Sequence, residues 1–494
     1  MYYPDFDSFC KKAEEGNLVP VYRELSADLE TPVSAFLKLH SDQPAFFLES
    51  VEKGERVGRY SFLASSPYWV LSSRGDRATL LQNDNQDEID LGQRDVLHLL
   101  EEMLAGYKAV KCEGLPPFVG GAVGFLSYDM VRFFERLPET PRDELGLPDC
   151  LFMFADTMVI FDHLRHTMKI VSNAQVTWDV AKAYEEAMAR IDAIVETLEG
   201  PLPRVDRPKM PLGDSELTSN FTLEEFCHKV EVAKEYIAAG DAFQIVLSQR
   251  LRRKTTADSF AIYRALRRLN PSPYMFYLDL GSYQLIGSSP EMLVKLEGRR
   301  ACIRPLAGTR RRGENEAEDI ALAAELLADE KERAEHVMLV DLARNDLGRI
   351  CRPGTVKVPI LMDVEKYSHV MHIVSEVEGE IRDDRNAFDL LRASFPAGTV
   401  SGAPKIRAME IIAELEDLRR GPYAGAVGNF GFSGDMDTCI TIRTIVKVGD
   451  TVYLQAGAGI VADSEPVREH QETMNKLRAL EQAVRIAEGR DESR

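Results

Sequence analysis

Residues 439–462 read CITIRTIVKVGDTVYLQAGAGIVA. Two runs with a two-residue alternation flank a Gly-Asp turn, which is the pattern of two strands joined by a tight connection. Residues 283–297, YQLIGSSPEMLVKLE, are predicted as one further strand. These strands are separated by turns more often than by the helical crossovers that parallel strands need. The chain is therefore predicted to be an α+β protein with mostly antiparallel sheets.

Residues 242–251, AFQIVLSQRL, also alternate, and we interpret them as a half-buried strand. In this strand Gln244 faces away from the side that carries Phe243, Ile245 and Leu247. A polar residue in the middle of a strand is usually solvated, so position alone assigns Gln244 no role.

Helical periods dominate residues 178–200 and 222–241. The second segment opens with a Thr-x-x-Glu capping box, and a glycine supplies the stop at the end of each. The stretch between them is rich in proline and turn formers, which is typical of a linker. The predicted parts are an N-terminal region, residues 1–200, a linker, residues 201–220, and a C-terminal domain, residues 221–494.

The composition restricts the partners of the chain. It has 494 residues with 60 basic and 80 acidic side chains, a formal net charge of −20 that argues against general nucleic-acid or anionic-membrane binding. The seven cysteines are dispersed without a C-x-x-C pair, as in a reduced protein without a zinc site. The first residues resemble no secretory signal, and no apolar run spans a bilayer. We expect a cytoplasmic protein.

Residues 305–313, PLAGTRRRG, place three arginines after a Gly-Thr turn. Such a stretch could grip a nucleic acid, cradle a small anion or form a solvated loop. The negative net charge and the lack of interleaved aromatic residues disfavour the nucleic-acid reading. We interpret the arginines as a solvated loop or as a contribution to the local electrostatic environment.

Two helical segments carry E-x-x-E, Glu332 with Glu335 and Glu469 with Glu472. Residues three apart share a helix face, so each pair of carboxylates is mutually repulsive. A solvated face beside Lys and Arg explains such a pair in an acidic protein. However, both pairs adjoin apolar or Gly-rich stretches, so they could instead face the interior. Facing carboxylates then need a hard cation with oxygen ligands, and Mg²⁺ is the expected one.

Several segments could contact an anion. Alternation places Arg443 on a strand, on the face opposite its isoleucine neighbours, where its planar guanidinium could meet a carboxylate. Gly457 and Gly459 allow close approach to the backbone, and the Gly-rich turn in residues 395–412 leads into a helix. Each of these could also be structural. None is a nucleotide-binding loop.

Taken together and in order, these segments resemble the chorismate-utilising enzymes, and among them the large components of anthranilate synthases. The resemblance covers residues 220–485, and FFLES at 46–50 extends it towards the N-terminus. It rests on SSPEML, PLAGTRRRG, AEHVMLVDLARNDLGR, YSHVMHIVSEVEG, FPAGTVSGAPK, GPYAGAVGNF, IRT, AGAGIVADSEP and ETMNK. It implies a core of large antiparallel sheets, packed like a sandwich and surrounded by helices.

Three positions distinguish members of this family. Members that add water carry a lysine base where this chain has Gln244, and a neutral amide cannot activate water in that way. Members that attack the ring covalently carry a lysine in PIKGT, where this chain has Ala307. His372 matches the histidine that the family links to pyruvate elimination. The resemblance therefore implies direct amination by ammonia to give anthranilate, and an aminodeoxychorismate-type synthase remains the closest alternative.

The resemblance also assigns roles to the candidate residues. Mg²⁺ is expected on Glu335 and Glu472, with Glu332 and Glu469 acting through water. Glu291 is expected to protonate the departing C4 hydroxyl of chorismate with a raised pKa. The expected catalytic set is Glu291, His372, Thr399 and Gln244. The expected substrate contacts are Gly308, Thr309, Tyr423, Arg443, Gly457, Ala458, Gly459 and Lys476.

Two partners follow from the resemblance. No cysteine follows a glycine or lies in a G-x-C-x-G pattern, so the chain needs a separate glutamine amidotransferase subunit to supply ammonia, in an expected heterotetramer of two of each. The N-terminal region, residues 1–200, is expected to be regulatory, with tryptophan as inhibitor. The expected tryptophan contacts are Ser50, Pro273, Tyr274 and Met275.

Overall fold

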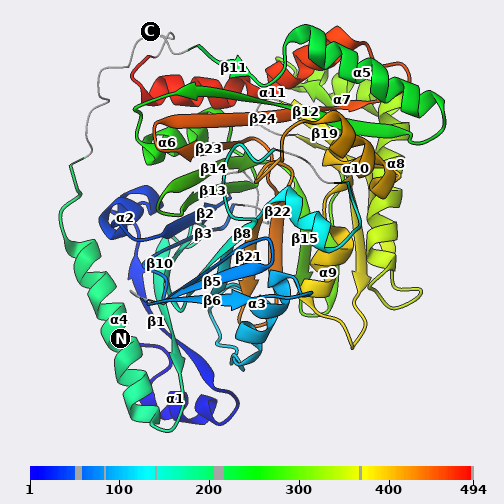
Figure 1. The fold of residues 1–494 in the computed structure, drawn as a ribbon. Helices are drawn as coiled ribbons and strands as arrows, with labels where there is room; N and C mark the ends of the chain where they lie inside the picture. Colours follow the sequence, from blue (N-terminus) through cyan, green and yellow to red (C-terminus); the bar gives the residue numbers. More distant parts are fainter. Residues whose placement is uncertain (51–57, 83–84, 139–141, 205–215, 367–369, 491–494) are drawn as a thin grey trace.

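Two large sheets with surrounding helices make up the fold (Figure 1). Each sheet has 12 strands, and neighbouring strands are antiparallel throughout the described chain. The α+β prediction is confirmed. The computed structural model describes residues 1–50, 58–82, 85–138, 142–204, 216–366 and 370–490.

The first sheet has the strand order β1-β10-β9-β3-β2-β13-β14-β23-β24-β12-β11, with β20 beside β12. Its strands are β1 (Leu18–Ser26), β10 (Thr167–Gln175), β9 (Thr157–Asp162), β3 (Tyr60–Ser65), β2 (Ala45–Glu49), β13 (Tyr274–Asp279), β14 (Tyr283–Ser289), β23 (Thr444–Val448), β24 (Thr451–Ile460), β12 (Gln244–Lys254), β11 (Thr218–Ser219) and β20 (Gly402–Ala403).

The second sheet has the strand order β17-β19-β16-β15-β22-β21-β7-β8-β4-β5-β6, with β18 beside β19. Its strands are β17 (Leu306–Arg311), β19 (Val370–Glu380), β16 (Arg300–Ile303), β15 (Met292–Glu297), β22 (Met436–Ile440), β21 (Ala426–Gly431), β7 (Gly121–Leu126), β8 (Cys150–Ala155), β4 (Trp69–Arg74), β5 (Arg77–Gln82), β6 (Asn85–Asp90) and β18 (Lys357–Lys366).

Helices cover the outer faces of the sheets. In Figure 1, α4 runs along the N-terminal part of the first sheet, and α11 packs on β24 beside α5 and α6. None of the described helices combines the length and apolar character that crossing a bilayer requires. The α-helices are α1 (Phe6–Ala13), α2 (Pro32–Leu39), α3 (Val96–Ala105), α4 (Val180–Glu199), α5 (Leu223–Ala238), α6 (Ser259–Leu269), α7 (Glu316–Ala328), α8 (Glu330–Gly348), α9 (Ala387–Ser394), α10 (Lys405–Leu415) and α11 (Pro466–Ala487).

The two sheets pack face to face over a shared apolar core. One buried cluster contains Phe46 and Phe276 from the first sheet together with Val123 and Met153 from the second. Residues from the two inner faces of stacked sheets interdigitate in this way because each face buries its apolar side. The predicted sandwich-like core is therefore confirmed.

Both sheets continue across the predicted domain boundary. Strand β2 pairs with β13 in the first sheet, and β7 pairs with β21 in the second. The predicted regions 1–200 and 221–494 therefore share both sheets, and neither has a sheet of its own. Composition shows a linker but not the pairing of strands from either side of it. Most of that linker, residues 205–215, lies outside the described residues.

The chain passes from one sheet to the other at two places that matter for the site. Strand β14 belongs to the first sheet and β15 to the second, and Pro290 and Glu291 join them. Strand β22 belongs to the second sheet and β23 to the first, and residues 441–443 join them. Each sequence run predicted as one strand is thus two strands in different sheets.

Three sequence predictions need correction. Strand β12 is buried on both faces for most of its length, whereas Phe243 just before it is 74% exposed, so the strand is not half-buried. Arg443 lies between strands with a φ of 51°, a left-handed conformation. Residues 306–311 form strand β17 and not a loop. The alternation of residues cannot reveal these features. They depend on which elements cover a strand and where the chain passes from one sheet to the other, and both are set by tertiary structure.

Candidate active site

One cavity of about 730 Å³ lies where the chain crosses between the sheets. Its walls come from β12, β17, β24, α8, α11 and the two crossing segments. The predicted catalytic, substrate and metal residues line it, with the exception of Ala458. Those on the wall are Gln244, Glu291, Gly308, Thr309, Glu332, Glu335, His372, Thr399, Tyr423, Arg443, Gly457, Gly459, Glu469, Glu472 and Lys476.

Glu291 is a buried carboxyl on this wall. It is 7% exposed and stands at the β14–β15 crossing, where its carbonyl accepts a hydrogen bond from the backbone N–H of Ile440 at 3.0 Å. Burial raises the pKa of Glu291 to about 8, although the nearby Thr399 hydroxyl and Lys476 ammonium oppose the shift. The side chain therefore holds a proton at neutral pH, as a general acid must.

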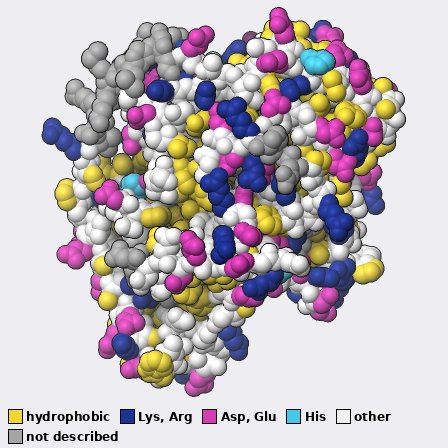
Figure 2. Space-filling view, viewed as in Figure 1, with side chains coloured by type: hydrophobic (Ala, Val, Ile, Leu, Met, Phe, Trp, Pro, Cys, Tyr) yellow, Lys and Arg dark blue, Asp and Glu magenta, His cyan; other side chains and the backbone are white. Residues whose placement is uncertain are grey.

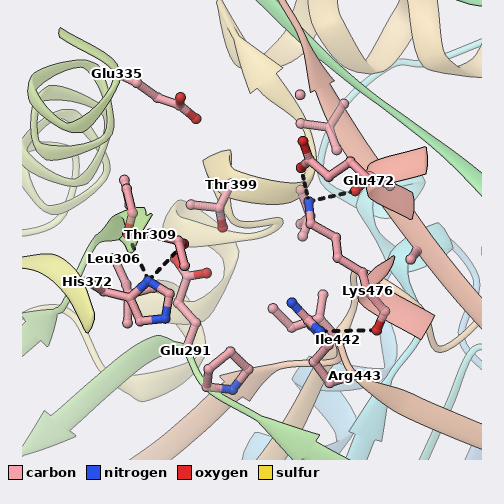
Figure 3. A pocket seen from close by; sticks show the side chains of 18 of the residues that line it. Glu291, Leu306, Thr309, Glu335, His372, Thr399, Ile442, Arg443, Glu472 and Lys476 are labelled. Carbon is pink, nitrogen blue, oxygen red and sulfur yellow. Dashed lines mark hydrogen bonds and ion pairs between the residues drawn. The ribbon is translucent and has the colours of Figure 1, made fainter. Parts of the chain in front are cut away.

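Arg443 faces the same cavity from the second crossing (Figure 3). Its guanidinium donates to the carbonyl of Lys476 at 3.0 Å, and its own carbonyl accepts from the N–H of Ser288 at 3.1 Å. Burial lowers the pKa of Arg443, although Tyr423 and Glu472 oppose the shift. A cation in this setting favours an anionic ligand, because a ligand charge would offset the lost solvation.

The backbone of β24 approaches the cavity closely. A Cβ atom at Gly457 would lie 2.8 Å from the Tyr423 hydroxyl oxygen, and one at Gly459 would lie 2.7 Å from the Gln244 side-chain nitrogen. At Gly457 the added atom would also lie 2.8 Å from the backbone carbonyl oxygen of Leu247, so glycine is required there, whereas at Gly459 the Gln244 side chain would have to move. Lys476 donates to the carbonyl of Gly457 at 2.9 Å and pairs with Glu472 at 2.6 Å.

His372 lies across the cavity beside β17. Its Nδ1 is 2.8 Å from the carbonyl oxygen of Gly308 and 3.1 Å from the Thr309 hydroxyl (Figure 3). Because a carbonyl can only accept, Nδ1 carries the proton of the neutral ring and Nε2 carries its lone pair. Burial lowers the pKa of His372, which keeps the ring neutral.

The two carboxylate pairs lie on opposite walls. Asp329 caps α8, which presents Glu332 and Glu335, whereas α11 presents Glu469 and Glu472. Burial raises the pKa of Glu332 and of Glu469, and in each case the second carboxylate of the pair adds to the shift. In Figure 3, Glu335 and Glu472 are separated across the open cavity.

These donors fit Mg²⁺ in their chemistry. They are all oxygen atoms, and their mutual repulsion is what a bound cation would relieve. Glu335 accepts a hydrogen bond from Gln244 at 3.1 Å, which orients it towards the cavity. Across the described chain, no three His, Cys, Asp or Glu side chains are already gathered around one point.

The structure places the remaining predicted residues elsewhere. Ala458 is fully buried and packs in the apolar cluster that contains Leu247 and Ile460, so its side chain does not face the cavity. Tyr274 and Met275 lie on β13, and Met275 is opposite Glu49 in the ladder to β2. Ser50 follows directly, which brings the predicted tryptophan contacts to one region.

The arginines of PLAGTRRRG lie on strand β17 or directly after it and not in a loop, and each pairs with acidic side chains of α7, of α8 or of the residue between them, in agreement with the predicted contribution to local electrostatics. Arg310 contacts Asp329 at 2.8 Å, Arg311 contacts Glu318 at 2.5 Å, and Arg312 contacts Asp319 at 2.6 Å. Arg310 also contacts Glu332 at 3.3 Å. On the face in Figure 2, Lys and Arg are interleaved with Asp and Glu, and no broad basic surface is seen.

Sequence reasoning missed several residues of the cavity wall. These are Asn270, Pro271 and Ser272, together with Gln455 and Asn475. The first three begin the NPSPYMFY segment from which only the inhibitor contacts were taken, and Asn475 belongs to ETMNK. For these four residues, membership of the motifs was the available signal, whereas Gln455 lies just before AGAGIVADSEP and outside the motifs on which the family resemblance rests.

A sequence model of chorismate binding enzymes matches residues 43–482. The chain therefore belongs to this family. It is similar to anthranilate synthase component 1 of Acetivibrio thermocellus, 47% identical over 99% of each chain. It is 49% identical to anthranilate synthase component 1 of Synechocystis sp., over 98% of this chain and 99% of the relative.

Solved structures agree with this assignment. The crystal structure of anthranilate synthase component I from Streptococcus pneumoniae TIGR4 has a TM-score of 0.77 and 38% identity, covering 92% of this chain and 98% of the other. The menaquinone-specific isochorismate synthase MenF of Escherichia coli has a TM-score of 0.71 at 18% identity, covering 97% and 98%. The second likeness shows the fold alone.

Proposed function

We propose that this chain converts chorismate and ammonia into anthranilate, pyruvate and water, as the first step of tryptophan biosynthesis. The observation that carries the proposal is the presence, in one cavity, of a buried carboxyl whose pKa is raised to about 8, Glu291, and a half-buried cation, Arg443. Chorismate offers matching chemistry, because it has two carboxylates and a hydroxyl that must leave. The names of the full-length relatives support the same product.

The cavity residues form two groups that would hold the two ends of chorismate. Arg443 and Tyr423, with the β24 backbone at Gly457 and Gly459, would hold the enolpyruvyl carboxylate. Glu335 and Glu472 would hold Mg²⁺, with Glu332 and Glu469 acting through water, and the bound cation would neutralise the ring carboxylate. Charge pairing at both ends would fix the ring beside Glu291.

Glu291 would give its proton to the C4 hydroxyl, which leaves as water while ammonia adds at C2. Neutral His372 would serve the second half, in which the C2 proton is lost and the enolpyruvyl group leaves as pyruvate. Ala307 lines the cavity and carries only a methyl group, so no lysine is available there for covalent attack on the ring. This supports direct amination.

The ammonia would come from a glutamine amidotransferase subunit, in an assembly of two of each chain. A glutaminase cysteine needs a lowered pKa. Burial instead raises the pKa of six of the cysteines, namely Cys112, Cys150, Cys227, Cys302, Cys351 and Cys439.

We expect the purified chain to form anthranilate from chorismate, Mg²⁺ and ammonium, and to form none when glutamine replaces ammonium. Anthranilate fluorescence measures both rates. At a fixed total ammonium concentration, turnover should rise with pH up to about 8, because the fraction of nucleophilic ammonia grows while Glu291 still holds its proton. Glutamine-dependent turnover by the pure chain would contradict the need for a partner.

We further propose that tryptophan inhibits the enzyme by binding near Ser50 and β13. The Ser50 hydroxyl is buried and has no hydrogen-bond partner among the described residues, so it is available to a ligand. Tryptophan would have to favour a conformation with a poorer cavity, a coupling of about 1–3 kcal/mol.

The Ser50→Phe enzyme should need at least about 10-fold more tryptophan for half-inhibition, the loss of a coupling of about 1.4 kcal/mol. The measurement is a tryptophan titration of anthranilate formation. Ser41→Phe, an exposed position before β2, is the matched control. Inhibition of Ser50→Phe equal to that of the wild type would remove Ser50 from the site.

A further inference from the structure

Directly behind the cavity wall lies a fully buried arginine that the proposed reaction does not use. Arg420 follows α10 and is 2% exposed. Its Nε and one terminal nitrogen donate to the two carboxylate oxygens of Glu416 at 2.8 and 2.7 Å. This bidentate pair fixes the plane and the direction of the guanidinium.

The remaining donors of Arg420 hold two segments of the cavity wall. One terminal nitrogen donates to the carbonyl of Val400 and the other to the carbonyl of Val246, each at 2.7 Å. Both valines line the cavity. Val400 directly follows Thr399, and Val246 lies two residues after Gln244 on β12. Arg420 therefore bridges the backbones that carry two predicted catalytic residues.

Two aromatic rings complete the surroundings of Arg420. Its guanidinium carbon lies 4.6 Å from the ring centre of Tyr128 and 5.7 Å from that of Tyr423, which are cation–π distances. Tyr423 belongs to the cavity wall, where burial raises its pKa to about 12 while Arg420 opposes the shift. The phenol consequently keeps its proton for a ligand.

Glu416 adds a second contact with β12 and, through Ser248, a link to the neighbouring strand β24. One of its oxygens accepts from the backbone N–H of Ser248 at 2.8 Å and from its hydroxyl at 3.0 Å. The hydroxyl in turn accepts from the side chain of Gln455 at 2.9 Å, and Gln455 lines the cavity. The pair thus contacts β12, the turn at Val400 and the ring of Tyr423, and it is linked to β24 through Ser248.

Stability alone gives a weak reason for such a pair. Burying two charges costs solvation that their attraction need not repay, and apolar residues of similar volume often serve as well. The distinguishing property of Arg420 is direction, since Glu416 fixes its guanidinium while its terminal nitrogens donate to Val400 and Val246, two different parts of one cavity wall. We propose that Arg420, held by Glu416, is a positioning residue that sets Thr399, Tyr423 and Gln244 for chorismate. This inference rests on the proposed function.

The test compares Arg420→Lys with Arg253→Lys. Arg253 is a second buried arginine, 6% exposed, on β12; it pairs with buried Glu488 at 2.5 Å, and neither Arg253 nor Glu488 lines the cavity. Lysine keeps the charge but loses the planar fork. We expect Arg420→Lys to lower kcat/KM for chorismate by about 10- to 100-fold, with a raised KM, and Arg253→Lys to leave both constants unchanged per folded molecule.

A second variant and a second readout keep the test decisive. Ser248→Ala, which removes one donor to Glu416, should raise KM for chorismate in the same direction even if Arg420→Lys does not fold. Calorimetric chorismate binding with Mg²⁺ present should weaken in both variants. Unchanged binding and kinetics in the variants, beside an active wild type, would overturn the positioning role alone. A wild type that makes no anthranilate would instead contradict the proposed function.

Discussion

The Glu291→Gln enzyme is expected to lose about 10²–10⁴-fold in kcat for anthranilate formation, the usual contribution of a general acid. The glutamine side chain matches the size of the carboxyl but has no proton to transfer to the departing hydroxyl. KM for chorismate should change much less, because Arg443 and the carboxylate pairs remain. Initial rates with saturating ammonium and Mg²⁺ measure the effect.

The role of Glu291 as an acid also predicts how kcat changes with pH. Burial raises the pKa of Glu291 to about 8, so the acid holds its proton below that pH and loses it above. At a fixed concentration of free ammonia, wild-type kcat should therefore fall as pH rises through about 8. The residual activity of Glu291→Gln should lack this limb. Glu297→Gln, at the exposed end of β15, is the matched control. Full turnover by Glu291→Gln would exclude the role.

The second large effect is expected from the carboxylate pairs. Glu335→Gln and Glu472→Gln should each weaken Mg²⁺ binding by at least about 10- to 100-fold, the range seen when groups supporting a metal are lost. Each substitution removes a negative charge from a wall whose carboxylates repel one another. Calorimetry reports Mg²⁺ binding directly, and the Mg²⁺ concentration for half-maximal rate reports it through turnover.

A matched control separates a specific site from general charge. Glu330 lies on α8 with Glu335, is exposed and does not line the cavity. The Glu330→Gln enzyme should therefore bind Mg²⁺ like the wild type. A chelator should abolish wild-type turnover, and added Mg²⁺ should restore it. If Glu335→Gln and Glu472→Gln both bind Mg²⁺ like the wild type, these residues are not its ligands.

Much of the fold could be predicted from local pattern. The two-residue period located strands such as β12 and β24, and caps located α5 with its Thr222 capping box. What the pattern could not show is which sheet a strand joins. Residues 283–297 look like one strand, yet the chain changes sheet at Glu291, because the partners that decide this are distant in sequence.

The candidate site could be assembled from the sequence only through the order of its motifs. Periodicity placed Arg443 on a strand, whereas tertiary pairing of β22 and β23 with different sheets holds it in a left-handed break. The role of Arg420 was not visible, because its partners Val246 and Val400 contribute only backbone carbonyls. Such contacts leave no side-chain signature.

The central claim is direct amination followed by loss of pyruvate. The most direct measurement incubates the purified chain with chorismate, Mg²⁺ and ammonium, and quantifies anthranilate by fluorescence and pyruvate by a coupled assay. We predict both products in equal amounts and in proportion to the enzyme. Consumption of chorismate to an aminated product without pyruvate, or no consumption at all, would contradict the account.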